Sequence, residues 1–572
     1  MATNGDSSAF TPDDPPSSSS STPLLYKPHP PLEDDPDQST PPDSDPTQYL
    51  QINYNHGPRF FKDIAFSILF GIFTLSTFAF GIFAIVNRNP NSSDVSSYSY
   101  SSNSSSCVKS TLAQSPYSEP LSAVLLHGKL NSVASSTHIL RDLVWTLVAT
   151  LILSFPFGLG LLVLLKNYTK QVVYVSLPFF IIIPIFVDIY WFVACTLDSD
   201  CSQSFPLAYR ILVLVFVLII IGIIVWIFVA NWHRIELTIR IIGVGSDALL
   251  ANLGLFGVLP GLTFAWLVYF APIVVFLVFA RLNGKIVAHE SSDEYSCVWK
   301  QDSWVPAYYA LAILTILWSS ATMVETQVYV VSGTVAQWYF AKDRTKPRRS
   351  IRSSLRNAFG PSSGTICLSG LLICIVRIVR SAVENVREQE GQGIFYLCLR
   401  CIVDTLLTAI EFLNKFTINF AAITGEAYCT SARMSYELLK RNLLSAVFVE
   451  TVSSRLLGGI IFVFSAIYTI AVCAILNAAT DLEADLYFVA ALAWALLLLI
   501  LGYFVHILDN VIDTIYICYA IDRDRGEVCK QDAHEVYVTS QSTGTPDPLS
   551  PPGLHSKCKQ NGSPSLMTRP PC

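Results

Sequence analysis

The chain has 572 residues, of which 52% are hydrophobic and only 14% are charged. Because soluble domains carry about 25% charged residues, this chain cannot cover all its apolar side chains with a charged surface. Most of its outer surface must therefore face hydrocarbon. The net charge is −6, and no concentrated basic face is present outside the membrane loops, which argues against nucleic acid as a partner.

The two ends of the chain differ in composition from the middle. Residues 1–57 hold nine Asp or Glu against one lysine, Lys27, together with many Pro and Ser. Such a segment buries too little apolar surface to offset the entropy of ordering, so residues 1–57 and the similar residues 526–572 are predicted to be disordered tails. No short apolar stretch with a cleavage site begins the chain, so the first apolar segment is expected to be a retained span.

Residues 58–525 are predicted to form one all-α, polytopic membrane domain with about ten transmembrane helices. A helix needs about 20 apolar residues to cross roughly 30 Å of hydrocarbon. Ten stretches fit: 64–86, 142–165, 172–197, 207–230, 249–280, 305–338, 362–384, 402–424, 456–478 and 485–508. The fifth and sixth exceed 30 residues and are expected to be tilted or broken. Leu259-Pro260-Gly261 supplies a cause for a break in the fifth.

Lys and Arg in the short loops orient the domain. The loop after the sixth span carries seven of them, whereas the loop after the ninth span, NAATDLE, carries none. We therefore expect the former loop and both tails to be cytosolic. One region fits poorly: Arg377, Arg380, Arg387 and Arg400 flank a loop that this scheme places outside, so the eighth span is expected to be partly amphipathic or re-entrant.

The same topology places residues 87–141 outside. They contain two glycosylation sequons, at Asn91 and Asn103, whereas the sequon at Asn167 lies in a tight cytosolic loop and is expected to be unmodified. Three cysteines fall on the outer side, enough for one disulfide, and the sequence leaves the pair open: Cys107, Cys201 and Cys297.

The sequence carries none of the common catalytic or cofactor-binding motifs, so an enzyme, a cofactor and a metal centre are not predicted. The lone CxxC at Cys398 and Cys401 lacks a second pair or nearby histidines, and helix packing is the favoured interpretation.

Ionisable residues at membrane depth are the strongest candidates for function, because each costs about 2.5 to 3.5 kcal/mol at a helix centre. Glu325 lies in the middle of the sixth span, and Trp318 and Tyr329 project within about 20° of the same line. A carboxylate between aromatic rings suits an organic cation. The structural alternative is that the two rings only pack against a neighbouring helix, while Glu325 pairs with Arg377 or Arg380.

Two further candidates have equally ordinary explanations. Asp188 follows a proline and precedes two aromatic residues, so it either serves function or lies near the outer head groups. His506, with Asp509 and Asp513 one and two turns on, forms either a proton relay or a cluster of hydrogen bonds at a helix end.

Three ordered motifs resemble the choline transporter-like proteins, a eukaryotic family of ten-span carriers. The sixth span ends in Gln327 and then VSGTVAQWYF. The eighth span ends in Phe412-Leu413-Asn414, then AITG and YCTSA. The tenth span closes with VIDTIYIC. The resemblance covers about Trp304 to Asp522, and the acidic, proline-rich amino terminus resembles plant members. The family motif Gly-Ser-x-x-Phe-Gly-Ser appears here with its last pair reversed, as Ser369-Gly370.

The resemblance implies a carrier of choline or a related organic amine, with or without coupling to protons, in the plasma membrane or in the Golgi or vacuole. Its partners would be a small-molecule substrate and the lipid bilayer. The alternative is a non-transporting membrane protein that organises lipid homeostasis or vesicle trafficking.

Overall fold

The computed structural model describes Tyr54 and residues 58–90, 98–101, 106–109, 122–197, 201, 205–230, 232–291, 294–341, 349–389, 394–479, 485–525, 528–531 and 533–535. The predicted disordered tails and the sequons at Asn91 and Asn103 lie outside these residues, apart from a few positions next to the membrane domain.

Long helices make up nearly all of the described chain, which confirms the all-α class. They are α1 (Ile64–Val86), α2 (Ser122–Leu197), α4 (Leu207–Ala230), α5 (Trp232–Ala251), α6 (Leu255–Ala280), α7 (Val305–Tyr339), α8 (Ser350–Phe359), α9 (Ser363–Gln389), α10 (Ile394–Thr424), α11 (Tyr428–Ala479) and α12 (Asp485–Arg525). Two hairpins complete the fold: β1 (Tyr98–Ser101) with β2 (Ser106–Lys109), and β3 (Gly284–Ser291) with β4 (Glu294–Gln301).

Nine helices in the described part of the chain are long and apolar enough to cross a membrane. One of them, Arg141–Leu197, has 57 residues. At 1.5 Å per residue it could cross a hydrocarbon layer of about 30 Å twice. Tyr168 has non-helical backbone angles (φ −133°, ψ 27°) and divides it into two parts. These parts correspond to the second and third predicted spans, so all ten predicted stretches are helical.

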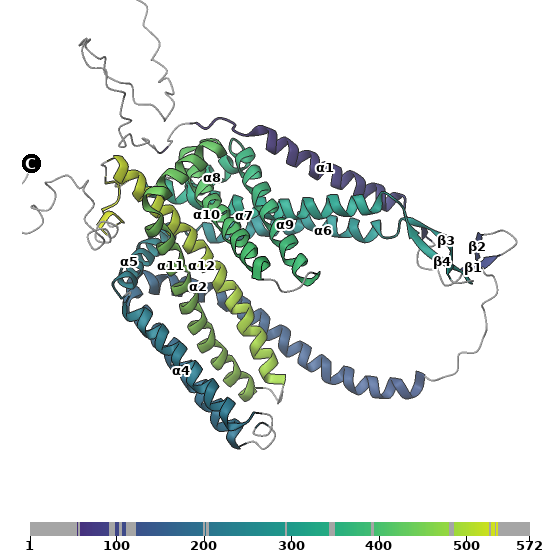
Figure 1. The fold of residues 1–572 in the computed structure, drawn as a ribbon, viewed down its shortest axis with the longest axis horizontal. Coiled ribbons are helices and arrows are strands. Elements are labelled where there is room, and N and C mark those ends of the chain that lie inside the picture. Colours follow the sequence, from purple (N-terminus) through teal and green to yellow (C-terminus); the bar gives the residue numbers. More distant parts are fainter. Residues whose placement is uncertain are drawn as a thin grey trace, which may run out of the picture.

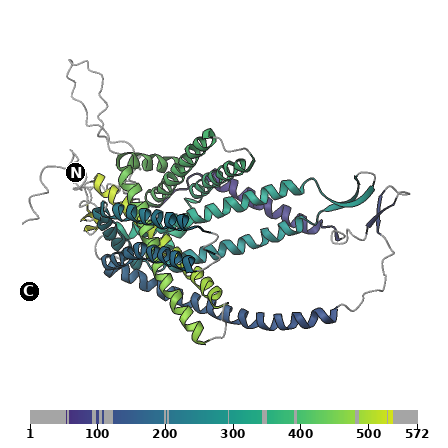
Figure 2. The ribbon, with the colours of Figure 1, turned by 60° about the horizontal axis from the view of Figure 1, so that its bottom comes forward.

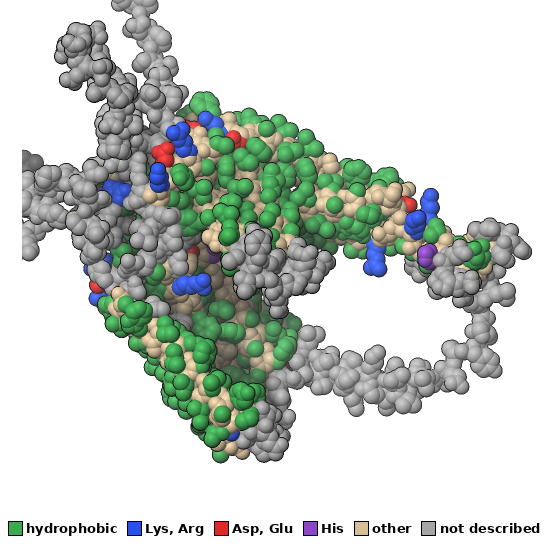
Figure 3. Space-filling model, viewed as in Figure 1, with side chains coloured by type: hydrophobic (Ala, Val, Ile, Leu, Met, Phe, Trp, Pro, Cys, Tyr) green, Lys and Arg blue, Asp and Glu red, His purple; other side chains and the backbone are tan. Residues whose placement is uncertain are grey.

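The chain runs back and forth between two ends of the molecule. At one end lie α5, α8, the first turn of α1 and the last turns of α7 and α12. At the other lie the two β-hairpins, β1–β2 between α1 and α2 and β3–β4 between α6 and α7 (Figure 1 and Figure 2). Hydrophobic side chains cover most of the flanks, and charged side chains gather mainly near the two ends (Figure 3). We call these the α8 end and the hairpin end. The molecule is a multi-pass integral membrane protein.

Ion pairs hold α5 against the α2 kink at the α8 end. Lys166 pairs with Asp247 at 2.5 Å and Lys170 with Glu236 at 3.7 Å. These charges explain why α5 lies between two spans without being one itself. Asn167 is exposed beside the kink.

The two hairpins are joined by one of the disulfides. Cys107 of β2 bonds to Cys297 of β4, and Tyr100 stacks on Tyr295 with ring centroids 4.5 Å apart. The pairing left open by the sequence is therefore Cys107–Cys297.

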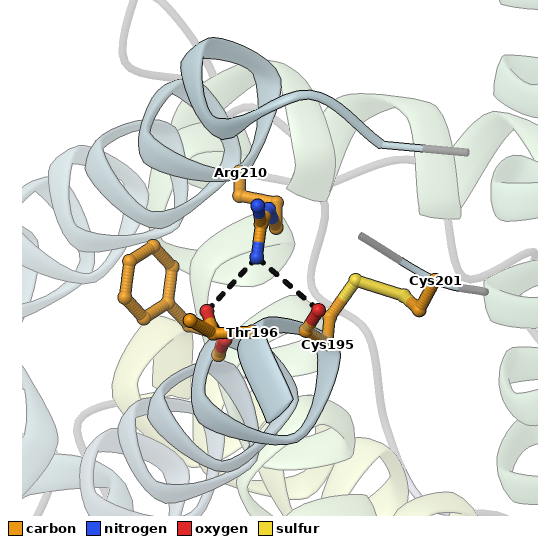
Figure 4. Close-up of a disulfide and its surroundings, with 5 residues drawn as sticks. Cys195, Thr196, Cys201 and Arg210 are labelled. Carbon is orange, nitrogen blue, oxygen red and sulfur yellow. Dashed lines mark hydrogen bonds between the residues drawn. A yellow bond between two sulfur atoms is a disulfide. The ribbon is translucent and has the colours of Figure 1, made fainter. Parts of the chain in front are cut away.

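Cys201 has a different partner, which the sequence did not suggest. It bonds to Cys195, at the end of the third span, and closes the short connection between α2 and α4 (Figure 4). Arg210 of α4 reinforces this connection by donating hydrogen bonds to the Cys195 carbonyl oxygen (3.2 Å) and to Thr196 Oγ1 (2.9 Å). The three outer cysteines considered from the sequence left out Cys195, which the end of the span brings within bonding distance of Cys201.

The predicted break at Pro260 was also wrong. α6 is continuous from Leu255 through Pro260 to Ala280, and the break falls earlier, in the turn at residues 252–254. Pro260 removes one helix hydrogen bond, yet α6 runs on through it as it does through Pro272, because membrane helices tolerate single prolines. The sixth span is a single helix, α7, of 35 residues.

The eighth span is not re-entrant, because α10 is one helix of 31 residues. Its two halves differ in burial: residues 416–424 are buried, whereas most of residues 401–410 are exposed. Two of the basic residues near its outer half have acidic partners. Arg380 pairs with Glu411 at 3.3 Å and Arg400 with Asp404 at 3.6 Å.

Candidate functional site

Glu325 lies inside the helix bundle, halfway along α7. Its side chain is buried, with 7% of the residue exposed. Among the residues that the structure describes, no Lys or Arg lies within ion-pair distance of it. Arg380 pairs with Glu411 instead, while Arg377 and Lys415 are close enough only to attract Glu325 electrostatically. The structural alternative of a direct ion pair is not seen.

Three polar residues from other helices surround this carboxylate. Ser369 Oγ of α9 lies 3.0 Å from Glu325 Oε2 and 2.9 Å from Asn414 Oδ1 of α10. Tyr428, the first residue of α11, donates its hydroxyl to the same Asn414 oxygen at 2.7 Å. We call Glu325, Ser369, Asn414 and Tyr428 the acceptor cluster.

The acceptor cluster holds more acceptors than donors. A hydroxyl has a single proton to donate, so Ser369 can satisfy either Glu325 or Asn414 at one time. The carboxylate alone can accept about four hydrogen bonds. The Asn414 amide Nδ2 is a buried donor that also has no partner among the described residues. The cluster therefore offers a ligand an unsatisfied donor beside the negatively charged acceptors, which a cation would satisfy.

The two aromatic residues predicted beside Glu325 are both buried and both have protein partners. Trp318 donates its indole N–H to the Cys367 carbonyl oxygen of α9 (3.0 Å), and its ring meets the edges of Phe70 and Phe73 of α1. The Tyr329 hydroxyl donates to Ser362 Oγ (2.8 Å) and accepts from Arg59 (2.5 Å). Trp318 and Tyr329 thus tie α7 to α1 and to the start of α9.

The predicted proton relay is not assembled as a chain of hydrogen bonds. His506 Nε2 lies 3.4 Å from Asn510 Nδ2, and no bond links it to Asp509 or Asp513 within the described residues. Asp509 accepts hydrogen bonds from Ser453 and Ser454 of α11. Asp513 pairs with Lys415 of α10 at 2.5 Å. The two aspartates join three helices to one another.

The remaining candidates are more isolated. Asp188 of α2 is buried, and its Oδ2 atom has no hydrogen-bond partner in the part of the chain described. Cys401 is an exposed free cysteine, and the described residues contain no group of three or more metal-ligating side chains.

The sequence analysis singled out Glu325 but not its companions. Ser369, Asn414 and Tyr428 come from three different helices, so no spacing along the chain reveals that they meet. A signal was nevertheless present, because all three residues lie in or beside the motifs that carry the family resemblance.

Comparison with known proteins gives a consistent result. Residues 215–524 match the family described as plasma-membrane choline transporter. Choline transporter-like protein 3 of Bos taurus is 24% identical over 435 residues, covering 70% of this chain and 62% of that protein. Choline transporter-like protein 1 of Mus musculus is 26% identical over 304 residues, covering 50% and 45% respectively.

A relative from Dictyostelium discoideum, choline transporter-like protein 2, is 24% identical over 322 residues, covering 54% of this chain and 50% of that protein. The chain thus spans about half the length of several curated relatives that it matches. The family match covers more than half of the chain and includes the acceptor cluster. This chain therefore belongs to the plasma-membrane choline transporter family.

Proposed function

We propose that the chain carries choline or a related organic amine across the plasma membrane, and that Glu325 supplies the charge that recognises it. The observation behind this proposal is a carboxylate buried within the bundle without an ion pair among the described residues. A buried charge that accepts a hydrogen bond but has no ion pair is still costly, and a bound cation would offset that cost.

The chemistry of the acceptor cluster fits a positively charged amine. Oxygen acceptors of Glu325 and Asn414 attract the cation, and Tyr428 adds an aromatic ring beside them. The same proposal includes Trp318 and Tyr329, the aromatic residues that α7 contributes. The names of the curated relatives support choline as the first amine to test.

Coupling to protons is a further part of the proposal. A carboxylate surrounded by acceptors can bind either a proton or an amine, but not both at once. Because the binding of one excludes the other, their movements across the membrane can be coupled. A relay through His506, Asp509 and Asp513 stays a prediction.

The test is uptake of labelled choline into proteoliposomes that contain only the purified protein. We expect Glu325→Gln to lower kcat/KM by about 10- to 100-fold, since a hydrogen bond to a charged group contributes about 1.5 to 3 kcal/mol. If an imposed pH gradient changes uptake by the wild-type protein, Glu325→Gln should lose that response as well.

Glu411→Gln is the matched control. It removes the same charge from α10, but Glu411 is partly exposed and pairs with Arg380. Uptake is normalised to protein that elutes as a monodisperse peak. If wild-type protein takes up no amine, the proposal fails in favour of a non-transporting role. If both variants transport like wild type, Glu325 is not the recognition site.

A further inference from the structure

A short segment before the first span ties together the inner ends of several helices. Residues 58–63, which we call the strap, run across the α8 end of the bundle just before α1 begins. Phe60 and Phe61 point outward, 74% and 65% exposed, as interfacial aromatic residues do. The charged side chains of Arg59, Lys62 and Asp63 reach the bundle instead.

The strap caps both helices that meet at the α10–α11 turn. Arg59 donates hydrogen bonds to the carbonyl oxygens of Ala422 (2.7 Å) and Ile423 (3.4 Å), in the last turn of α10. Asp63 Oδ2 accepts the backbone N–H of Tyr428, the first residue of α11, at 2.8 Å. A cation at a helix carboxyl end and an anion at a helix amino end both complement the helix dipole and its unpaired groups.

Other contacts fix the strap to α9 and to the turn itself. Asp63 Oδ2 also accepts a hydrogen bond from Thr365 Oγ1 of α9 (2.8 Å), and Lys62 pairs with Glu426 at 3.5 Å. A side chain at Gly364 could not fit, because its Cβ would lie 2.1 Å from the Asp63 carbonyl oxygen. The strap therefore lies in direct contact with the amino end of α9.

These contacts lead directly to the acceptor cluster. Arg59 binds the hydroxyl of Tyr329, one helical turn from Glu325 on α7. Asp63 binds the backbone of Tyr428, whose side chain belongs to the cluster, and it binds Thr365, one turn from Ser369. The strap thus holds α7, α9, α10 and α11 together on the α8 side of Glu325.

We propose that the strap is a gate that closes the α8 end of the acceptor cluster. An amine leaving Glu325 toward that end must pass between helices that the strap ties, so the strap has to release Arg59 and Asp63 before the helix ends separate. Its ties are hydrogen bonds and one ion pair near the surface, which can break and re-form. The proposal that the strap gates a transported amine rests on the proposed function. The proposal that the strap opens does not.

Opening can be measured without any substrate. Ser431 lies in the first turn of α11, fully buried, and its hydroxyl has no hydrogen-bond partner in the described chain. Ser431→Cys is therefore a mild reporter beneath the strap. It is made in a background that lacks the other cysteines a maleimide could reach. These are the exposed or partly exposed free cysteines of the described residues, Cys401, Cys429, Cys473 and Cys529, together with Cys398, Cys558 and Cys572. Labelling by a small hydrophilic maleimide is timed in nanodiscs.

Arg59→Gln should speed labelling of the reporter by about 10-fold or more, because it removes the charge-assisted bonds that close the gate. Arg433→Gln is the matched control, since Arg433 is exposed, pairs with Glu437 within α11 and forms no hydrogen bond or ion pair with the strap among the described residues. Lys62→Glu should speed labelling by about 2- to 5-fold, as expected for a partly exposed ion pair. The double variant Lys62→Glu/Glu426→Lys should restore the wild-type rate.

Equal labelling rates in wild-type protein and in folded Arg59→Gln and Lys62→Glu variants would overturn the gate. The charge swap keeps the test decisive if Arg59→Gln does not fold, because rescue by Glu426→Lys requires the ion pair itself. Faster labelling in a protein that takes up no choline would leave the gate standing and reject the amine substrate. Unchanged labelling in a protein that does take up choline would reject the gate alone.

Discussion

Gly425 shows how one residue permits the arrangement of the strap and the α10–α11 turn. It has a φ of +76°, and its backbone N–H bonds to the Ala421 carbonyl oxygen at the end of α10. Glycine adopts this left-handed conformation without the steric cost that a Cβ imposes. A Cβ here would also lie 3.2 Å from the Arg59 side chain. The same position therefore serves the turn and makes room for the strap.

We expect Gly425→Ala to destabilise the protein by about 1 to 2 kcal/mol, the cost of a left-handed conformation for a non-glycine residue. Gly458→Ala is the control, because a Cβ at Gly458 of α11 meets nothing within 4 Å. That change should be neutral or stabilising by up to about 1 kcal/mol, since alanine favours the helix. Thermal unfolding of both variants in the same detergent compares them. Equal unfolding temperatures would contradict this role of Gly425.

At the scale of elements, the apolar spans were predictable and their connections were not. Span length and hydrophobicity are local properties, so all ten stretches were located from the sequence. Charged residues with distant partners were not: Asp63 meets Tyr428 across 365 positions, and Ser369 meets Glu325 across 44. Pro260 misled because a membrane helix can run on through a proline, as α6 does at both Pro260 and Pro272.

The disulfides give a prediction at the same scale. Peptide mapping without reduction should recover Cys107 linked to Cys297, and Cys195 linked to Cys201. Cys297→Ser should loosen the joined hairpins, because it releases a link across 190 positions, and limited proteolysis of the hairpin segments should become faster. Cys367→Ser, which changes a buried free thiol, should leave proteolysis there unchanged. A peptide linking Cys201 to Cys297 would contradict the arrangement.

At the scale of the whole molecule, the two ends differ in their electrostatic character. Seven Lys or Arg follow the sixth span: Lys342, Arg344, Lys346, Arg348, Arg349, Arg352 and Arg356. The connection between α11 and α12 contains none. An excess of basic residues marks the cytosolic side of membrane proteins, so we expect the α8 end to face the cytosol. The strap would then be the cytosolic gate, and the two hairpins would lie outside.

One labelling experiment orients all of these parts at once. Lys285 of β3 and Ser353 of α8 are both exposed and lie at opposite ends of the bundle. In intact cells, a membrane-impermeant thiol reagent should label Lys285→Cys, whereas Ser353→Cys should react only after permeabilisation. Because the chain crosses the membrane ten times, the start of α1 and the end of α12 lie at the same end. If the reagent labelled only Ser353→Cys in intact cells, every connection would lie on the opposite side of the membrane. The strap would then close the path to Glu325 from outside, and an amine entering the cell would meet the gate before the carboxylate.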